Sequence, residues 1–176
     1  ISMLFMGEEW GARTPFLFFC DFDGELAAAV RKGRREEFAR FPEFQDPAKR
    51  KRIPDPQSDA TFAASKLNWN ELGRSEHADW LRWYRRILQV RQQSIVPLLE
   101  RIAHAGSYEV LAPGCVSVQW QAGAQRLQLV ANLSSEVVSA ATLKFDHLLW
   151  TEGTVTEQTL SPWSVRWSLV DIGRVQ

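Results

Sequence analysis

The sequence predicts a mixed fold, an α/β segment followed by an antiparallel β-sheet or sandwich, and three patterns carry this prediction. Residues 1–6 form a continuous apolar run, the pattern of a strand covered on both faces. Residues 75–93 repeat apolar side chains at helical spacing, and after Gly106 the spacing changes to two, as in half-buried antiparallel strands. The predicted domains are therefore residues 1–105 and 106–176.

The composition is that of an ordinary globular protein. The 176 residues are 45% apolar and 11% aromatic, enough for one domain or two small ones. Lys plus Arg equals Asp plus Glu at 21 each, so no net field attracts nucleic acid or an anionic membrane surface. The longest apolar runs are too short to span a bilayer. We expect no nucleic-acid partner, no membrane partner and a neutral substrate.

The first element is predicted to be a parallel central strand over Ile1–Met6, ended by Gly7. A strand covered on both faces needs neighbours, and the rest of the sequence does not obviously provide them. The chain also begins with Ile1 in place of an initiator Met. These two observations predict a fragment that packs on an N-terminal part which is missing here.

A long irregular connection is predicted between Gly11 and Ser75, because five prolines punctuate it. One mostly solvated helix is expected within it, over residues 24–40 and capped by Asp23. Connections of this length are uncommon unless they carry function. We therefore expect this connection to be a long loop that lies over a functional site.

A second helix is predicted from Ser75 to Gln93, with Glu76 and Asp79 in its first turn and Pro97 breaking the pattern after it. Its apolar positions cover more than one narrow stripe: Trp80, Leu81, Trp83, Tyr84, Ile87, Leu88 and Val90. This pattern predicts a helix that is buried against more than one body, between two domains.

The C-terminal region predicts roughly six or seven short strands. Alternating apolar positions occur at residues 116–120, 127–131 and 163–169, and turn residues occur at Pro113-Gly114, Gly123 and Gly153. The tryptophans that follow helical or strand spacing are expected in the core: Trp80, Trp83, Trp120, Trp163 and Trp167.

Several separate motifs resemble the maltooligosyltrehalose trehalohydrolase family of α-amylase-type glycoside hydrolases. They agree in order and spacing: MLFMGEEWGA (3–12), PFLFFCDF (15–22), GRREEFARFPEF (33–44), RIPDP (52–56), TFAASKLNW (61–69), WYRRILQVR (83–91) and, within the strand region, ANLS (131–134). The resemblance implies that residues 1–105 are the last strand, long loop and last helix of a (β/α)8 TIM barrel. It also implies that residues 106–176 are the C-terminal β-domain.

The same resemblance implies a function. The family hydrolyses the α-1,4 bond next to the terminal trehalose of maltooligosyl trehalose and releases trehalose, with no metal or organic cofactor. The reaction resembles that of other retaining glycosidases, in which one carboxylate is the nucleophile and another the acid and base. In this family those carboxylates lie on strands before the eighth. No catalytic residue is therefore expected here, and the chain alone is expected to be inactive.

Four residues are candidates for binding maltooligosyl trehalose or another α-glucan. Glu8, Glu9 and Trp10 follow the predicted strand, at the end where barrel active sites lie. Glu8 and Glu9 cannot both be catalytic, because adjacent side chains of a strand point to opposite faces and a retaining pair flanks one bond. Trp10 and Trp69 offer rings for the apolar face of a sugar. The alternative for all four is structural, fixing the strand end or anchoring the loop.

Other polar residues favour no second site. Asp21 and Asp23 resemble the first motif of haloacid-dehalogenase-type phosphatases, but Glu25 departs from it and no later magnesium motif follows. The histidines are single and expected to be structural: His77, His104 and His147. Two distant cysteines, Cys20 and Cys115, indicate neither a zinc site nor a disulfide framework. A reducing, cytoplasmic location is the default expectation.

Two alternatives remain open beside the trehalose-releasing hydrolase. The chain is then either a noncatalytic carbohydrate-binding or domain-docking module in which the β-domain acts, or part of another α-amylase-superfamily enzyme such as a branching enzyme. Binding of maltooligosaccharide to the chain tests the first alternative, and the upstream sequence tests the second.

Overall fold

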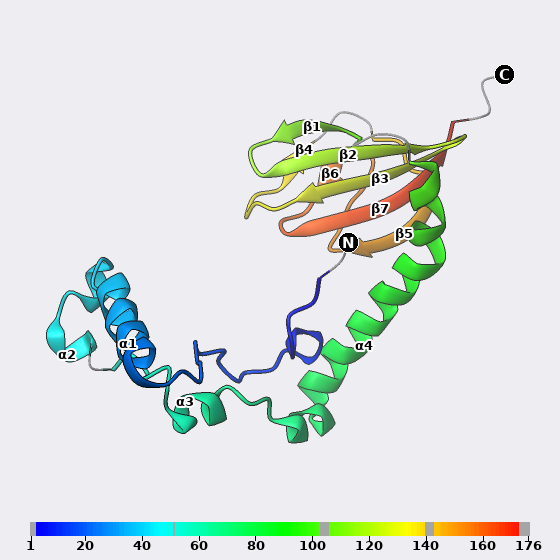
Figure 1. Cartoon of the computed structure of the whole chain (residues 1–176). Coiled ribbons are helices and arrows are strands. Elements are labelled where there is room, and N and C mark those ends of the chain that lie inside the picture. Colours follow the sequence, from blue (N-terminus) through cyan, green and yellow to red (C-terminus); the bar gives the residue numbers. More distant parts are fainter. Residues whose placement is uncertain (1–2, 51, 103–105, 140–142, 173–176) are drawn as a thin grey trace. The chain divides into compact units, whose positions relative to one another are not determined.

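The structure is a computed structural model, and it describes residues 3–50, 52–102, 106–139 and 143–172. The chain forms two compact units, Ile1–Arg82 and Trp83–Gln176. Figure 1 shows the helices and strands, coloured from the N-terminus to the C-terminus. In the part that the structure describes, every helix is too short or too polar to cross a bilayer. The predicted division into a barrel end and a β-domain at residues 105 and 106 stays a prediction.

The N-terminal unit consists of short helical turns joined by irregular chain (Figure 1). Its elements are η1 (Glu8–Trp10), α1 (Gly24–Phe38), η2 (Pro42–Phe44), α2 (Pro47–Arg50), α3 (Asp59–Ala64), η3 (Trp69–Gly73) and the first half of α4 (Ser75–Val90). None of the residues described in this unit lies in a strand. The described residues of this unit therefore do not form the predicted barrel strand.

The prediction of a strand over residues 1–6 is wrong for the part that is described, and Ile1 and Ser2 lie outside the described residues. Residues 3–5 have no regular structure, and Met3 and Phe5 are 92% and 52% exposed. A strand is held by hydrogen bonds to a neighbouring strand, and the described part of this unit offers none. The side chains of Leu4 and Met6, in the same apolar run, are also exposed to solvent.

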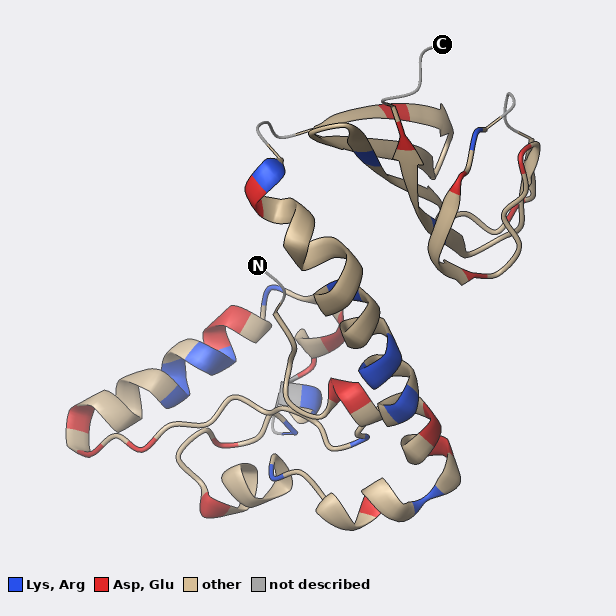
Figure 2. Ribbon diagram, turned by 90° about the vertical axis from the view of Figure 1, so that its right-hand side faces the viewer, with Lys and Arg blue, Asp and Glu red and all other residues tan. Residues whose placement is uncertain are grey.

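Helix α1 confirms the predicted solvated helix, two residues shorter than expected. Asp23 occupies the N-cap position but its side chain makes no capping hydrogen bond, and Ala27 is the residue of this helix that is buried. Figure 2 shows acidic and basic residues interspersed along it. The helix is tied to the following loop by Arg31, whose Nε lies 3.0 Å from Asp55 Oδ1. A hydrogen bond from the backbone of Gln57 lowers the pKa of the Asp55 carboxyl, and Arg31 lowers it further.

The predicted helix over residues 75–93 changes type before it ends. Helix α4 runs from Ser75 to Val90 and passes into a π-helical turn, η4 (Arg91–Ile95), and a 3-10 helix, η5 (Val96–Arg101), that contains Pro97. Of its seven apolar positions, Trp80 and Leu88 are 51% and 38% exposed and the other five are half-buried, while the buried residue of α4 is His77. The predicted position of this helix between two domains stays a prediction. The apolar spacing predicted the helix correctly but did not show what covers it.

The second unit contains the predicted small antiparallel β-sheet domain. Five strands form one sheet in the order β1 (Ser107–Ala112), β2 (Cys115–Ala122), β3 (Gln125–Asn132), β7 (Ser164–Asp171) and β5 (His147–Glu152). A short pair, β4 (Val138–Ser139) and β6 (Thr159–Leu160), forms a second sheet. All pairings in the main sheet are antiparallel, as the alternation predicted.

Both faces of the main sheet carry part of the core. On one face Cys115 and Val130 pack with Val138, Val155 and Leu160. On the other face Ala122 and Leu127 pack with Leu98 of η5. The rings of Trp120 and Trp167 stack on this second face, with centroids 5.6 Å apart. The alternation marked the second face as the apolar one, but it did not show that the first face is also covered.

Asn132 holds together the loops at one end of this domain. It is fully buried, and its Nδ2 donates hydrogen bonds to the carbonyl oxygens of Glu136, Leu160 and Ser161. Its Oδ1 accepts hydrogen bonds from the backbone and side chain of Ser134. This residue belongs to the ANLS motif, so the motif has a structural role in the β-domain.

Trp163 corrects another expectation. It lies just before β7 rather than within it, is 68% exposed and has a φ of 52°. A bulky residue with positive φ is unusual, and here it lies in the turn that enters β7. The predicted core position of Trp163 is therefore wrong, as is that of Trp80.

Candidate functional site

Three of the four predicted site residues, Glu8, Glu9 and Trp10, lie on a tight turn in the N-terminal unit. Gly7 and Gly11 flank η1 with φ values of 85° and 63°, which L residues with a side chain rarely adopt. A Cβ on Gly7 would also lie 2.7 Å from Cβ of Ala12 and 2.8 Å from Cδ2 of Leu67. The two glycines therefore permit a compact turn that presents Glu8, Glu9 and Trp10.

Glu8 and Glu9 are half-buried, and they differ in their contacts. Oε2 of Glu8 accepts a hydrogen bond of 3.0 Å from the backbone N–H of Phe5, so this carboxylate helps to close the turn. Glu9 makes no hydrogen bond or ion pair with another residue that the structure describes. Since both residues lie on a 3-10 turn, they are about 120° apart and not on opposite faces of a strand. Glu9 is the carboxylate that is left available.

Trp10 and Trp69 lie together, and their exposure separates their roles. Their ring centroids are 4.9 Å apart with planes inclined at 42°. Trp10 is 2% exposed, whereas Trp69 is 64% exposed. A sugar ring can stack only on an accessible aromatic face. Trp69 therefore offers an exposed ring face to a sugar, and the buried ring of Trp10 packs against Trp69.

His77 holds this turn against α4, a contact that sequence reasoning did not find. Its imidazole is 2% exposed, and Nδ1 lies 2.7 Å from the carbonyl oxygen of Trp10. A carbonyl oxygen only accepts, so Nδ1 carries the hydrogen that donates. The only sequence signal was the position of His77 in the first turn of an amphipathic helix, which does not reveal a partner 67 residues away.

Two buried polar atoms, Trp10 Nε1 and Glu71 Oε2, have no hydrogen-bond partner among the described residues. Nε2 of His77 also makes no hydrogen bond, but it lies 3.5 Å from Oε1 of Glu76. Glu71 follows Trp69 in η3 and is 9% exposed. Buried polar groups in native proteins are nearly always paired with protein or water. Beside the packed rings of Trp10 and Trp69, some buried polar atoms therefore remain able to form a hydrogen bond.

Asp21 and Asp23 do not form the phosphatase site that their motif resembles. That motif places its aspartates at the end of a strand, whereas the residues leading up to Asp23 have no regular structure and both carboxylates are exposed. Asp21 lines a cavity of about 410 Å³ with Cys20 and Asp59. Within the described ranges, no three side chains of His, Cys, Asp or Glu are grouped closely enough to hold a metal ion.

Among the described residues, His147, Cys20 and Cys115 do not form a shared site. Nε2 of His147 lies 3.6 Å from Oδ2 of Asp171, and His104 lies outside the described residues. Cys20 and Cys115 are both free thiols. Cys115 is 1% exposed, and burial raises the pKa of its thiol.

Alkylation is expected to distinguish the two thiols. Iodoacetamide should modify Cys20 faster than Cys115 by on the order of tenfold, because the thiolate is the reactive form and Cys115 is both buried and less ionised at a given pH. Peptide mass spectrometry after short exposures measures the two rates. In denaturant the rates should converge, which is the control, and equal rates in the native chain would contradict the burial of Cys115.

The comparisons with known proteins give this fold and turn a context. Residues 103–167 match a family model described as a domain of unknown function, DUF3459. A crystal structure of a Salmonella typhimurium protein assigned to the alpha amylases superposes with a TM-score of 0.80 and 37% identity. The superposition covers 94% of this chain and 27% of the Salmonella typhimurium protein. The chain is thus similar to part of an α-amylase family glycoside hydrolase.

Curated relatives make the similarity more specific. A Deinococcus radiodurans protein is 38% identical over 161 residues, which is 86% of this chain and 25% of the relative. A Mycobacterium tuberculosis protein is 50% identical over 91 residues, 51% of this chain and 15% of the relative. Both are named malto-oligosyltrehalose trehalohydrolase. The resemblance stated from the sequence motifs is confirmed, and the chain spans at most a quarter of these relatives' length.

Proposed function

We propose that this chain is the C-terminal part of a glycoside hydrolase that cleaves the α-1,4-glucosidic bond next to the terminal trehalose of maltooligosyl trehalose. The product is trehalose, so the enzyme serves trehalose formation from α-glucan. The observation that carries the proposal is the 38% identity with the trehalohydrolase of Deinococcus radiodurans, because it extends over 86% of the chain and so includes both units. The catalytic carboxylates then lie in the rest of the protein.

The exposed apolar residues at the start of the chain support a barrel partner. Met3, Leu4, Phe5 and Met6 are each at least 45% exposed, and such a run is stable as a strand only when both faces are covered. In the proposal this run joins the barrel as its last strand, and residues 1–105 complete the barrel. Two free thiols are in keeping with a reducing compartment, and we assign the protein to the cytoplasm.

The turn at Gly7–Gly11 then lies beside the bound α-glucan. Trp69 stacks on a sugar ring, and Glu9 accepts a hydrogen bond from a sugar hydroxyl. Trp10 and Glu8 act mainly by shaping the turn, because one is buried and the other is bonded to the backbone of Phe5. Neither carboxylate is assigned to the chemical step.

The test is trehalose release by the protein encoded by the complete open reading frame. Purified full-length protein should liberate trehalose from maltooligosyl trehalose, and the chain Ile1–Gln176 alone should not. Transfer of glucan branches without trehalose release would identify another α-amylase-superfamily enzyme. Trehalose release by the isolated chain would overturn the assignment of the catalytic carboxylates to the rest of the protein.

Replacement of Trp69 by alanine in the full-length protein is expected to raise KM for maltooligosyl trehalose about tenfold. Loss of an aromatic stacking face removes about 1 kcal/mol or somewhat more of binding free energy, and kcat should change less because Trp69 does not touch the reacting atoms in the proposal. Trp163→Ala is the matched control, since Trp163 is 68% exposed and belongs to the other unit. Equal KM values for both variants would remove Trp69 from the substrate site.

The two alternatives are not favoured by the comparisons. The curated relatives described above are both named as trehalohydrolases, and neither name is that of a branching enzyme or of a noncatalytic module. Direct binding of maltooligosaccharide by the isolated chain with an affinity equal to that of the full-length protein would revive the module hypothesis.

A further inference from the structure

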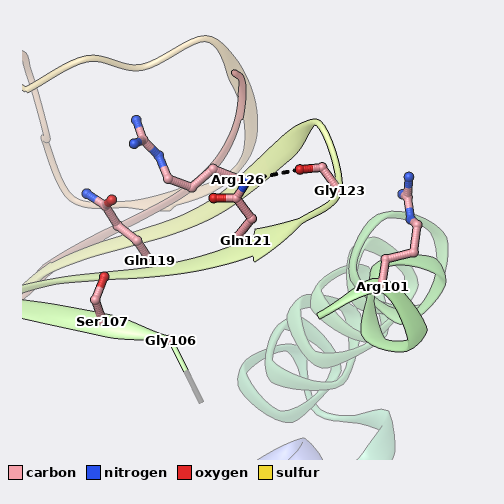
Figure 3. Close-up of a pocket in the computed structure, with 7 residues that line it drawn as sticks. All are labelled: Arg101, Gly106, Ser107, Gln119, Gln121, Gly123 and Arg126. Atoms are coloured by element: carbon pink, nitrogen blue, oxygen red, sulfur yellow. Dashed lines mark hydrogen bonds between the residues drawn. The ribbon is translucent and has the colours of Figure 1, made fainter. Parts of the chain in front are cut away.

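A polar cavity of about 590 Å³ in the β-domain is lined by two arginines, Arg101 and Arg126 (Figure 3). Arg101 comes from η5, and η5 packs against the sheet face that carries Leu127. Arg126 precedes Leu127 in β3, so its side chain lies on the opposite face of the sheet. The two guanidinium groups therefore cannot hold one ligand together.

In the N-terminal unit, a buried histidine connects the turn at Gly7–Gly11 to α4. Backbone hydrogen bonds close this turn on itself, among them a bond of 3.0 Å from the N–H of Gly11 to the carbonyl oxygen of Glu8. The carbonyl oxygen of Trp10 instead accepts a hydrogen bond of 2.7 Å from Nδ1 of His77, in the first turn of α4. This imidazole is 2% exposed, so the bond is shielded from competing water.

A second polar contact between this region and α4 is open to solvent. Nη2 of Arg13 lies 3.1 Å from Oε2 of Glu76, and the two side chains are 72% and 53% exposed. Ion pairs that are this accessible to water contribute little. Gly11 adds a steric contact, because a Cβ there would lie 3.2 Å from Cδ1 of Trp80. His77 therefore provides the buried hydrogen bond between the turn and the helix.

This hydrogen bond acts on the ring that meets the sugar in the proposed function. It fixes the peptide group that follows Trp10, and the ring centroid of Trp10 lies 4.9 Å from that of Trp69. Trp10 is 2% exposed and Trp69 is 64% exposed, so the packed ring limits where the exposed ring can lie. A shift of the Trp10 peptide would therefore move the stacking face of Trp69 and the neighbouring carboxylate of Glu9.

We propose that His77 is a positioning residue for α-glucan binding, because its Nδ1–H holds the carbonyl group of Trp10 and thereby places Trp69 and Glu9 for the sugar. This inference rests on the proposed function, since it concerns the same turn and the same class of substrate. In this role His77 touches neither the sugar nor the reacting bond, and it acts on KM rather than on kcat. A role in stability alone would instead lower the fraction of folded enzyme, which reduces the apparent kcat and leaves KM unchanged.

The first experiment measures trehalose release by the full-length protein with His77→Ala. KM for maltooligosyl trehalose should rise about tenfold, as for Trp69→Ala, because the stacking face is misplaced in one variant and missing in the other. The value of kcat should change by less than about twofold. His147→Ala is the matched control, since this imidazole is exposed on β5 in the other unit, and it should leave both constants unchanged. An unchanged KM for His77→Ala would overturn the proposal.

Two amide variants separate the hydrogen bond from the volume of the ring. The amide nitrogen of Asn is attached where Nδ1 is in His, whereas that of Gln reaches about as far as Nε2. His77→Asn should therefore keep KM within about twofold of the wild-type value, and His77→Gln should not. Both variants keep a polar side chain, so they decide the question even if His77→Ala folds poorly. Equal KM values for the two would mean that a donor at the position of Nδ1 does not place the turn, which would overturn the proposal.

A double variant tests whether His77 acts through Trp69. If it does, His77→Ala combined with Trp69→Ala should have the KM of either single variant, because the second change removes nothing further. A rise in KM equal to the product of the two single rises would show independent action and overturn the proposal. Thermal unfolding of every variant defines a temperature at which all are folded, and the kinetic constants are compared there.

The wild-type protein distinguishes this inference from the proposed function. If it releases trehalose and His77→Ala has a normal KM, only the positioning role fails. If it releases none, the proposed function fails, and the same variants are compared by their Kd for maltooligosaccharide, measured from tryptophan fluorescence. A higher Kd for His77→Ala than for His77→Asn would then support the positioning role, and no binding by the wild-type protein would overturn both proposals.

Discussion

Replacement of Trp10 by alanine is expected to destabilise the N-terminal unit by about 3–5 kcal/mol, the usual range for removal of a buried aromatic side chain. Trp10 is 2% exposed and packs against Trp69. The unit has few other large buried apolar side chains among its described residues, so the cavity left by the indole cannot easily be filled from the surroundings. Loss of the near-ultraviolet circular dichroism signal at a lower denaturant concentration measures the effect.

Two further variants distinguish packing from hydrogen bonding at this position. Trp69→Ala should cost about 1 kcal/mol, because that ring is 64% exposed and contributes mainly its contact with Trp10. His77→Ala should cost about 1–3 kcal/mol, since it leaves the buried carbonyl of Trp10 without its donor. If Trp10→Ala unfolds at the same denaturant concentration as Trp69→Ala, the burial of Trp10 described here is wrong.

Replacement of Asn132 by alanine is expected to destabilise the β-domain by about 3 kcal/mol or more. Its side chain donates to the carbonyl oxygens of Glu136, Leu160 and Ser161 and accepts two hydrogen bonds from Ser134. Each buried polar group left unpaired costs about 1–3 kcal/mol, and neighbouring losses are only partly additive. Thermal unfolding followed by circular dichroism measures the change.

The control for this variant is an exposed asparagine. The side chain of Asn70 is exposed and is not a partner in the hydrogen bonds of η3, so Asn70→Ala should change stability by about 0.5 kcal/mol or less. Asn132→Asp should also destabilise, because an ionised carboxylate accepts but cannot donate to the three carbonyl oxygens. A wild-type melting temperature for Asn132→Ala would mean that the loops at this end of the sheet are held by other contacts.

At the start of the chain, the sequence pattern predicted a structure that the described residues do not adopt. The apolar run at residues 1–6 predicted a central strand, but Met3, Phe5 and their neighbours are exposed and irregular in the part that is described. A strand requires hydrogen bonds to a neighbouring strand, and none of the residues described in the N-terminal unit lies in one. The relationship to α-amylase family proteins therefore depends on the sequence and structure comparisons, and not on this segment.

The residues of the candidate site were predicted from sequence motifs, and the structure corrected the roles of those residues. The motif containing Glu8, Glu9 and Trp10 was found because its residues are contiguous, and Trp69 because it lies in a separate motif. Only the folded chain brings Trp10 and Trp69 into contact and separates them into a buried and an exposed ring. Neither spacing nor composition revealed that His77 binds the turn, since the contact joins residues far apart in sequence.

By itself, the sequence determined the antiparallel character of β2, β3 and β7 and the positions of α1 and α4, because alternation and helical spacing are local consequences of backbone geometry. Tertiary structure alone decided which side chains are covered. It exposed Trp163 and Trp80 and buried the polar side chains of Asn132 and Gln128. Burial depends on which distant segments meet, and a period along the chain carries no information about that.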